Sequence, residues 1–323
     1  VSMRAIKNYA GGYKAAAGLP PERLLKDGIL NKSQVVGVRQ GLYNVTEMLN
    51  HYRKILSDGI RILCIDDAAY PERLRNIDNA PELIYARGEL PDDEKPSVSI
   101  IGARSCSDYG IAAAEYFAGE LAACGVQIVS GLAYGIDAAA AEGAMRRGGK
   151  SFAVLGSGVN VCYPKENYPL YRRMTGIISE FSPSAEALPR HFVMRNRLIA
   201  GLGDVLIVME AREKSGTSIT VGYALEQGKD IFALPGRITD PLGRGCNKLL
   251  RDGAIPLTEP EDVLIYLGIS ADASESRGKG AGDNGIAVGY DMSGLTADER
   301  TVYGLLSAEP MHTEEISLRT DKG

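Results

Sequence analysis

The sequence predicts an α/β protein built on a doubly wound, mostly parallel β-sheet. Between residues 98 and 268, short apolar runs alternate with helix-compatible segments, which is typical of parallel strands with helices on both faces. Several runs end in glycine-rich turns, at the strand ends where such sheets bind ligands. The runs are Val98–Gly102, Val126–Val129, Ser151–Leu155, Ile177–Phe181, Val205–Met209, Ile231–Leu234 and Ile255–Leu257.

Two kinds of segment precede this alternation. Residues 1–57 contain short helical patterns broken by glycine and proline, and they predict a small all-helical domain. Residues 58–96 then predict a strand at Gly59–Ile65, a proline-started helix at Tyr70–Ile77 and a strand at Glu82–Gly88. We expect this piece to extend one edge of the larger sheet, so that the α/β domain spans residues 58–268.

The C-terminal part has a different composition. Residues 269–290 are rich in Ser, Gly, Asp and Lys, and they predict a flexible linker. Order is expected to resume at Leu295, where Thr296 and Glu299 form a capping box. One and a half helices cannot close a core of their own. Residues 291–323 therefore predict only part of a C-terminal domain.

Composition limits the possible partners. Lys and Arg number 36 against 41 Asp and Glu, a net charge of -5, so nucleic-acid binding would need a local basic patch on an acidic body. Neither a membrane-length apolar run nor a signal pattern is visible, so we expect a cytoplasmic protein without a membrane partner. The cysteines are scattered and form no CxxC pair, which favours reduced thiols over disulfides or zinc. They are Cys64, Cys106, Cys124, Cys162 and Cys246.

Four turns that follow predicted strands should meet at one edge of the sheet. Any one of them could be a glycine that merely permits a tight turn, but together they favour an anion site, because free N–H groups and helix dipoles converge there. Arg104 adds a guanidinium suited to bidentate phosphate contact. The turns are Gly102–Ser105, Ser130–Gly135, Gly156–Asn160 and Lys214–Ser218, with candidate contacts Gly102, Arg104, Ser105, Gly131, Gly156, Lys214, Ser215, Gly216 and Thr217.

The stretch from Cys162 to Tyr171 adds basic and aromatic side chains. Lys165 and Tyr168 combine an amine with a ring, the pairing by which proteins grip a single nucleic-acid strand. For Tyr163 and Tyr171 we prefer the interpretation of ordinary core residues with polar tips.

A third stretch, at residues 189–197, is rich in arginine. Arg195 and Asn196 should lie near the start of an apolar helix, where they could face the same mouth. The alternative is a solvated helix face.

Two common nucleotide-binding motifs are absent. The segment Gly156–Val161 has valine in place of the third glycine of GxGxxG, which argues against a nicotinamide site. The sequence also lacks GxxxxGK[ST], so a P-loop ATPase has no direct support.

With these residues assembled, the chain resembles the DNA processing protein A family (DprA, also called Smf). The resemblance extends from about Ile60 to Leu267, and its motifs are jointly specific. The matching stretches are Tyr70–Ile77, Ala80–Gly88, Ser99–Arg104, Val129–Asp137, Leu155–Asn160, Tyr163–Pro164, Met194–Gly201, Lys214–Thr217, Ala233–Gly236 and Gly243–Asn247.

The resemblance implies a non-enzymatic protein of natural transformation that binds single-stranded DNA, protects it and loads RecA recombinase onto it. It also implies a homodimer that needs no cofactor. Family members have a sterile-alpha-motif-like helical domain, an extended Rossmann-like domain and often a winged helix, of which residues 291–323 would be the opening. Carried onto this sequence, Arg104 and Lys165 would be the principal DNA contacts and Tyr168 a stacking ring.

The alternative is a nucleotide-binding enzyme of the phosphoribohydrolase (lysine-decarboxylase-like) type. Such enzymes carry Pro-Gly-Gly-x-Gly-Thr-x-x-Glu at a similar helix start. Here Thr220 fills the position of the glutamate. Without that carboxylate the hydrolysis lacks its acid/base, although nucleotide binding stays possible.

Overall fold

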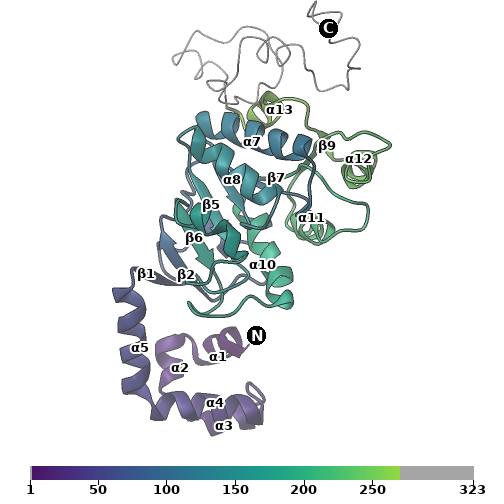
Figure 1. Cartoon of the computed structure of the whole chain (residues 1–323). Coiled ribbons are helices and arrows are strands. Elements are labelled where there is room, and N and C mark those ends of the chain that lie inside the picture. The colour runs from purple at the N-terminus through teal and green to yellow at the C-terminus, as the bar shows by residue number, and fades with distance from the viewer. Residues whose placement is uncertain (1, 270–323) are drawn as a thin grey trace, which may run out of the picture. The chain divides into compact units, whose positions relative to one another are not determined.

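A computed structural model describes residues 2–269 of the chain. The predicted C-terminal segment (291–323) and all but the first residue of the predicted linker (269–290) lie outside the described residues. The helical N-terminal segment is confirmed (Figure 1). Leu24, Leu30 and Val35 form its small core. Its helices are α1 (Ser2–Ala10), α2 (Tyr13–Ala17), α3 (Pro21–Lys26), α4 (Lys32–Tyr43) and α5 (Val45–Ser57).

The described strands form one nine-stranded sheet in the order β1-β2-β6-β5-β4-β3-β7-β8-β9. β1 and β2 are antiparallel to their neighbours and extend the sheet beyond β6, as expected for an appended edge piece, whereas all other pairs are parallel. The strands are β1 (Ile60–Cys64), β2 (Leu83–Gly88), β3 (Ser97–Ile101), β4 (Gln127–Ser130), β5 (Ser151–Val154), β6 (Gly176–Ser179), β7 (Val205–Val208), β8 (Ile231–Ala233) and β9 (Ile255–Pro256).

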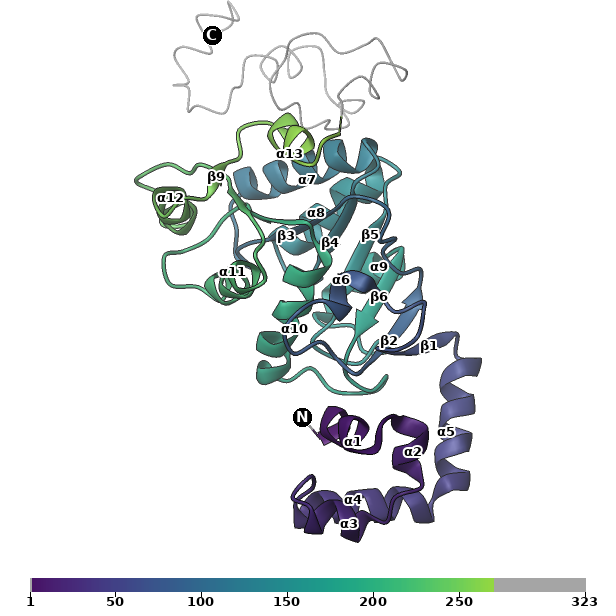
Figure 2. The ribbon, with the colours of Figure 1, turned by 180° about the vertical axis from the view of Figure 1, so that it is seen from behind.

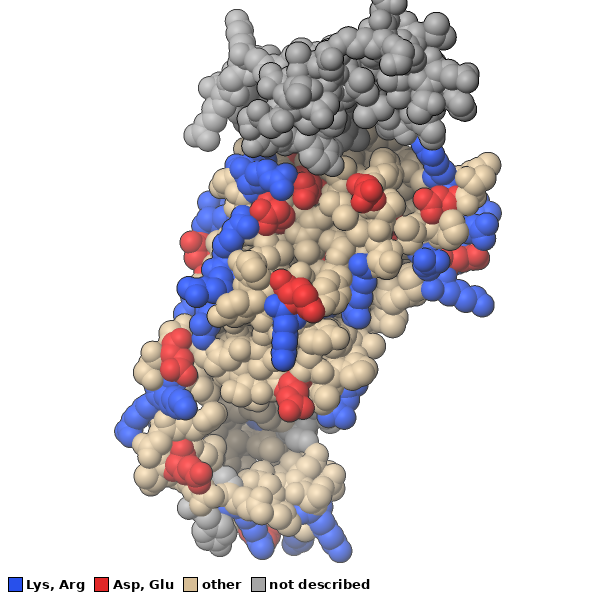
Figure 3. Space-filling view, viewed as in Figure 1, with Lys and Arg blue, Asp and Glu red and all other residues tan. Residues whose placement is uncertain are grey.

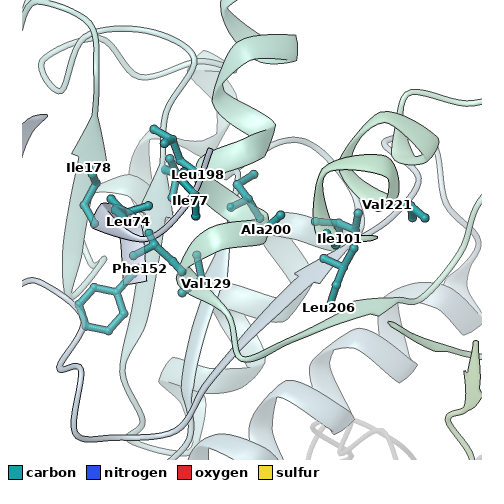
Figure 4. Packing of buried hydrophobic residues seen from close by; sticks show 14 of the residues in the cluster. Leu74, Ile77, Ile101, Val129, Phe152, Ile178, Leu198, Ala200, Leu206 and Val221 are labelled. Atoms are coloured by element: carbon teal, nitrogen blue, oxygen red, sulfur yellow. The ribbon is translucent and has the colours of Figure 1, made fainter. Parts of the chain in front are cut away.

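Helices cover both faces of this sheet (Figure 2). On one face α7, α8 and α13 share an apolar cluster with strand residues such as Ile100 and Ile128. On the other, α6, α10 and α11 pack through Leu74, Leu198 and Val221 (Figure 4). The helices are α6 (Glu72–Arg75), α7 (Asp108–Ala123), α8 (Ile136–Arg146), the 3₁₀ turn η1 (Lys165–Asn167), α9 (Tyr168–Tyr171), α10 (Pro189–Leu202), α11 (Thr217–Glu226), α12 (Arg244–Arg251) and α13 (Pro260–Tyr266).

The strand order reverses at β3. The chain proceeds outward through β4, β5 and β6 on one side and through β7, β8 and β9 on the other. The turns after β3 and β7 therefore lead to opposite faces and leave a crevice at the carboxyl ends of the strands, which is where doubly wound sheets bind their ligands. Among residues 2–269, the helices are all too short or too polar to span a membrane.

Candidate nucleic-acid interface

A cavity of about 500 Å³ opens at this reversal point. Its walls are the turns after β3, β4 and β7, the segment after β5 that carries Tyr163, and α10 from Pro189 to Ile199. This is the edge at which the sequence predicted an anion site. The cavity is lined mainly by Gly102, Arg104, Ala133, Asp137, Tyr163, Phe192, Arg195, Asn196, Ser215, Gly216, Thr217 and Thr220.

An aromatic ring lies between two arginines at the cavity. The guanidinium carbon of Arg104 is 5.5 Å from the ring centroid of Phe192, and that of Arg195 is 5.9 Å from the same centroid. Cations at this distance are attracted by the ring face. Arg104 is exposed and, within the described part of the chain, makes no ion pair. Its charge is therefore available to a ligand.

Arg195 differs from Arg104 because it is buried, with only 3% of its surface exposed. Its Nη1 donates to the carbonyl oxygens of Val154 and, at 2.8 Å, of Gly131. Burial lowers the pKa of Arg195 to about 10, although attraction by Asp137 opposes the shift. Arg195 therefore holds two strand-end carbonyls together and places a fixed positive charge in the cavity floor.

Asp137, at the start of α8, completes this floor. Its Oδ2 accepts hydrogen bonds from the N–H groups of Gly131 at 3.1 Å and Ala133 at 3.4 Å. Burial raises the pKa of Asp137, against the opposing attraction of Arg195. A Cβ on Gly131 would lie 2.6 Å from Nη1 of Arg195 and 2.7 Å from Oδ2 of Asp137. Only glycine fits between these two charged groups.

The loop that carries Arg104 is fixed at both ends by Glu210. The carbonyl oxygen of Glu210 accepts a 2.8 Å hydrogen bond from Ala103 N–H, and its carboxylate accepts from the N–H of Ser107 at 2.9 Å and from the Ser107 hydroxyl. Ser107 in turn caps α7 through Gly110 N–H. The sequence analysis did not assign this role to Glu210. The feature that could have indicated it is an acidic residue directly after the apolar run Val205–Met209.

The structure brings together some of the predicted contacts and separates others. Gly131 and Gly156 are buried behind the cavity wall, and a Cβ on Gly156 would lie 2.6 Å from the ring of Phe192. Lys165 and Tyr168 are exposed on η1 and α9, outside the lining. Ser105 and Lys214 are exposed and adjoin lining residues. The predicted residues that line the cavity are Gly102, Arg104, Arg195, Asn196, Ser215, Gly216 and Thr217.

The expected core position of Tyr163 was wrong. Tyr163 is 45% exposed, lines the cavity and packs against Phe192 at a centroid distance of 5.3 Å, because the chain after β5 runs along the cavity rim. Tyr171 is buried, as expected, at 8% exposure. The two rings at the cavity, Tyr163 and Phe192, are thus ones that the sequence did not assign to the site.

No group of three or more His, Cys, Asp or Glu side chains is placed to hold a metal ion anywhere in residues 2–269. The cavity instead offers one exposed cation, two rings and the N-terminus of α11. Gly216, the N-cap residue there, provides no side-chain cap. The N–H groups of Ser218 and Ile219 donate to the carbonyl oxygens of Ser215 and Gly216, each at 3.2 Å, so α11 offers an anion mainly the positive end of its helix dipole.

A family model described as DNA recombination-mediator protein A matches residues 61–268. The chain belongs to this family. The resemblance noted in the sequence is thereby confirmed. DprA of Streptococcus pneumoniae is 42% identical over 201 residues, which cover 61% of this chain and 71% of that protein. Protein Smf of Escherichia coli is 38% identical over 206 residues, covering 62% of this chain and 55% of that protein.

Solved structures of DprA proteins share the fold. The X-ray structure of S. pneumoniae DprA superposes with a TM-score of 0.72 at 34% identity, covering 82% of this chain and 92% of that one. DprA from Helicobacter pylori, whose structure concerns its single-stranded DNA binding mode, gives a TM-score of 0.57 at 27% identity. That match covers 64% of this chain and 95% of that one.

Proposed function

We propose that this protein is a non-enzymatic recombination mediator that binds single-stranded DNA in the cavity beside Arg104. The observation that carries the proposal is an exposed arginine without an ion-pair partner in the described chain, held on a loop fixed at both ends by Glu210. A preorganised guanidinium at the mouth of a cavity suits a phosphate group. The start of α11 lines the same cavity, and the positive end of its helix dipole suits a second phosphate.

The rings at the cavity suggest how bases are accommodated. Tyr163 and Phe192 offer apolar faces on which a base can stack, a contact that tolerates any sequence. Lys165 and Tyr168, on the neighbouring η1 and α9, would extend the contact with the strand. Because phosphates and ring faces carry little base information, binding should be largely sequence-independent and should weaken with salt.

Family membership supports the remaining parts of the proposal. We infer that the protein acts in DNA uptake in the cytoplasm, protects incoming strands and hands them to RecA recombinase. We also infer that it acts as a homodimer, which would join two cavities along one strand. The DNA-binding part has additional support from the H. pylori relative, whose structure concerns single-stranded DNA binding.

Arg104→Ala tests the proposal directly. We expect affinity for a labelled oligothymidylate to fall about tenfold or more, since one charge-assisted phosphate contact is lost. Arg146→Ala is the matched control, because Arg146 lies on α8 and pairs with Glu115 at 2.9 Å. Fluorescence anisotropy at fixed salt measures both. Equal affinities for the two variants would refute the proposed site.

One observation favours the alternative enzyme. Asp137 is a buried carboxylate of raised pKa beside a cavity, as a general acid requires. However, its Oδ2 is engaged by two backbone N–H groups, and Thr220 fills the position of the expected glutamate. We therefore expect no release of free base from nucleoside monophosphates. Detectable turnover that Asp137→Asn abolishes would establish the enzyme instead.

A further inference from the structure

A second group of cations lies beside the cavity, on two loops that meet at the start of α12. Arg212 and Lys214 belong to the loop after β7, whereas Arg237 and Arg244 belong to the connection from β8 into α12. We call these four residues the α12 strip. All four are exposed, and none of them makes an ion pair with another residue in the described chain. Lys214 is followed directly by Ser215, which lines the cavity.

Close backbone contacts hold these loops against each other. The N–H of Gly245 donates to the carbonyl oxygen of Ala211 at 2.7 Å. The side chain of Asn247 bonds both the N–H and the carbonyl oxygen of Gly236, at 3.0 and 2.8 Å. A Cβ on Gly236 would lie 2.5 Å from the Cα of Gly243, so the two backbones touch. The loops therefore form a fixed surface.

These contacts bring cations from two separate loops close together. Arg212, Arg237 and Arg244 are each adjacent in sequence to a contact point, so they arise from one small area. Figure 3, viewed as Figure 1 is, shows Lys and Arg gathered on the side where α12 lies, with a few acidic residues among them. Of the acids in the same loops, Asp240 bonds its own turn and Glu213 lies between two cations. The net charge of the strip is positive.

Two exposed arginines elsewhere in the α/β domain have acidic partners instead. Arg146 pairs with Glu115 at 2.9 Å, and Arg173 pairs with Glu142 at 2.9 Å. Cations gathered without acidic partners repel one another, and a bound polyanion relieves that repulsion. We therefore expect the α12 strip to bind a polyanion.

We propose that a DNA strand leaving the cavity continues over the α12 strip and contacts it through phosphates alone. This inference rests on the proposed function. The two loops, residues 211–214 and 236–244, contain no aromatic residue, in contrast to the cavity with its Tyr163 and Phe192. The strip therefore supplies charge without base stacking. Affinity should rise when an oligonucleotide is long enough to reach from the cavity onto the strip.

The test compares a short oligothymidylate of about four nucleotides, enough for the cavity, with one of about twenty. The double variant Arg237→Gln/Arg244→Gln should bind the short oligomer like the wild type. With the long oligomer, the slope of log affinity against log salt should decrease by about 1.4, or about 0.7 for each lost phosphate contact. The control variant Arg146→Gln/Arg173→Gln removes the same number of positive charges, from α8 and from the segment after α9. It should bind both oligomers like the wild type.

Two results would contradict the proposal that DNA contacts the α12 strip. One is a long-oligomer slope equal to that of the control variant, and the other is an equal loss of affinity for both oligomers. The failure of the proposed function would look different, because Arg104→Ala would then leave short-oligomer binding intact. The dependence of affinity on oligomer length therefore tests the strip, and the affinity for the short oligomer tests the cavity.

Discussion

Gly131 lies where two buried charges approach each other, so its hydrogen atom is the only side chain the site accommodates. For Gly131→Ala we expect a loss of about 1–3 kcal/mol in the free energy of unfolding, because the added methyl would displace Arg195 or Asp137. Urea denaturation measures the loss. Gly222→Ala is the control: nothing lies within 4 Å of its Cβ position on α11, and it should stabilise by up to about 1 kcal/mol. Equal effects at the two glycines would contradict this account.

At the scale of single residues, the sequence predicted the charged side chains at the cavity better than the aromatic ones. The position of Arg104 at the cavity could be predicted, because an arginine directly after a buried strand has few structural roles. Phe192 and Tyr163 could not, because an aromatic residue in a helix or turn has the same sequence pattern whether it packs in a core or lines a cavity. Arg195 was predicted at the cavity, but its burial depends on the carbonyls of Gly131, directly after β4, and of Val154 in β5, which only the folded sheet brings near.

Among the elements, α13 offers a test of pH dependence. The Asp262 carboxylate accepts hydrogen bonds from Thr258 N–H at 2.7 Å and Glu259 N–H at 3.0 Å. Burial alone would raise its pKa, but these bonds hold the pKa below its ordinary value of 3.8. Its stabilising contribution is therefore fully present above that ordinary value and is lost as the pH falls through the lowered one.

Asp262→Ala should accordingly cost about 1 kcal/mol of unfolding free energy at neutral pH. The difference from wild type should disappear in strongly acidic buffer, where the carboxylate is protonated in both states. Urea denaturation across the pH range provides the measurement. Glu261→Ala, which removes an exposed charge from the same first turn, should have a smaller effect. A pH-independent difference would show that the cap acts through packing alone.

The elements themselves were largely predictable. Buried parallel strands are continuous apolar runs, and each predicted run from Val98 to Leu257 overlaps a strand to within one or two residues at its ends. The helix predicted at Tyr70–Ile77 is shorter, at Glu72–Arg75. Sequence periodicity could not give the order of the strands, since the pairing of β2 with β6 depends on contacts across a long stretch of chain.

For the molecule as a whole, the boundary predicted at residues 57 and 58 remains a prediction. The cluster of Leu24, Leu30 and Val35 is separate from the sheet's core, and the ion pair between Lys7 and Asp66 is exposed. Exposed pairs of this kind contribute at most about 1 kcal/mol. Less exposed contacts are also present. Arg4 Nη2 donates to the carbonyl oxygen of Ala80 at 2.9 Å, the Tyr13 hydroxyl donates to the Glu82 carboxylate, and Ile55 of α5 is buried with the residues around β1.

A fragment of residues 58–269 should therefore unfold cooperatively and retain its affinity for oligothymidylate within about twofold. We expect it to lose about 3 kcal/mol from the burial of Ile55, and a further contribution of about 1–3 kcal/mol from the hydrogen bonds of Arg4 and Tyr13 to Ala80 and Glu82. A fragment of residues 45–269, which keeps α5, should recover the part of that loss that comes from Ile55. Calorimetry and anisotropy measure the two quantities. A 58–269 fragment that fails to fold would show that α1–α5 belong to the same cooperative unit.

The pairing of β3 with β7 also has a consequence for biosynthesis. Val98 pairs with Val205, so β3, the strand at which the order reverses, lacks one neighbour until the ribosome has made everything between them. Loop closure over such a distance slows folding. The cavity needs the turns on both sides of this pair. A nascent chain therefore cannot hold DNA there until the segment through Thr220 has left the ribosome.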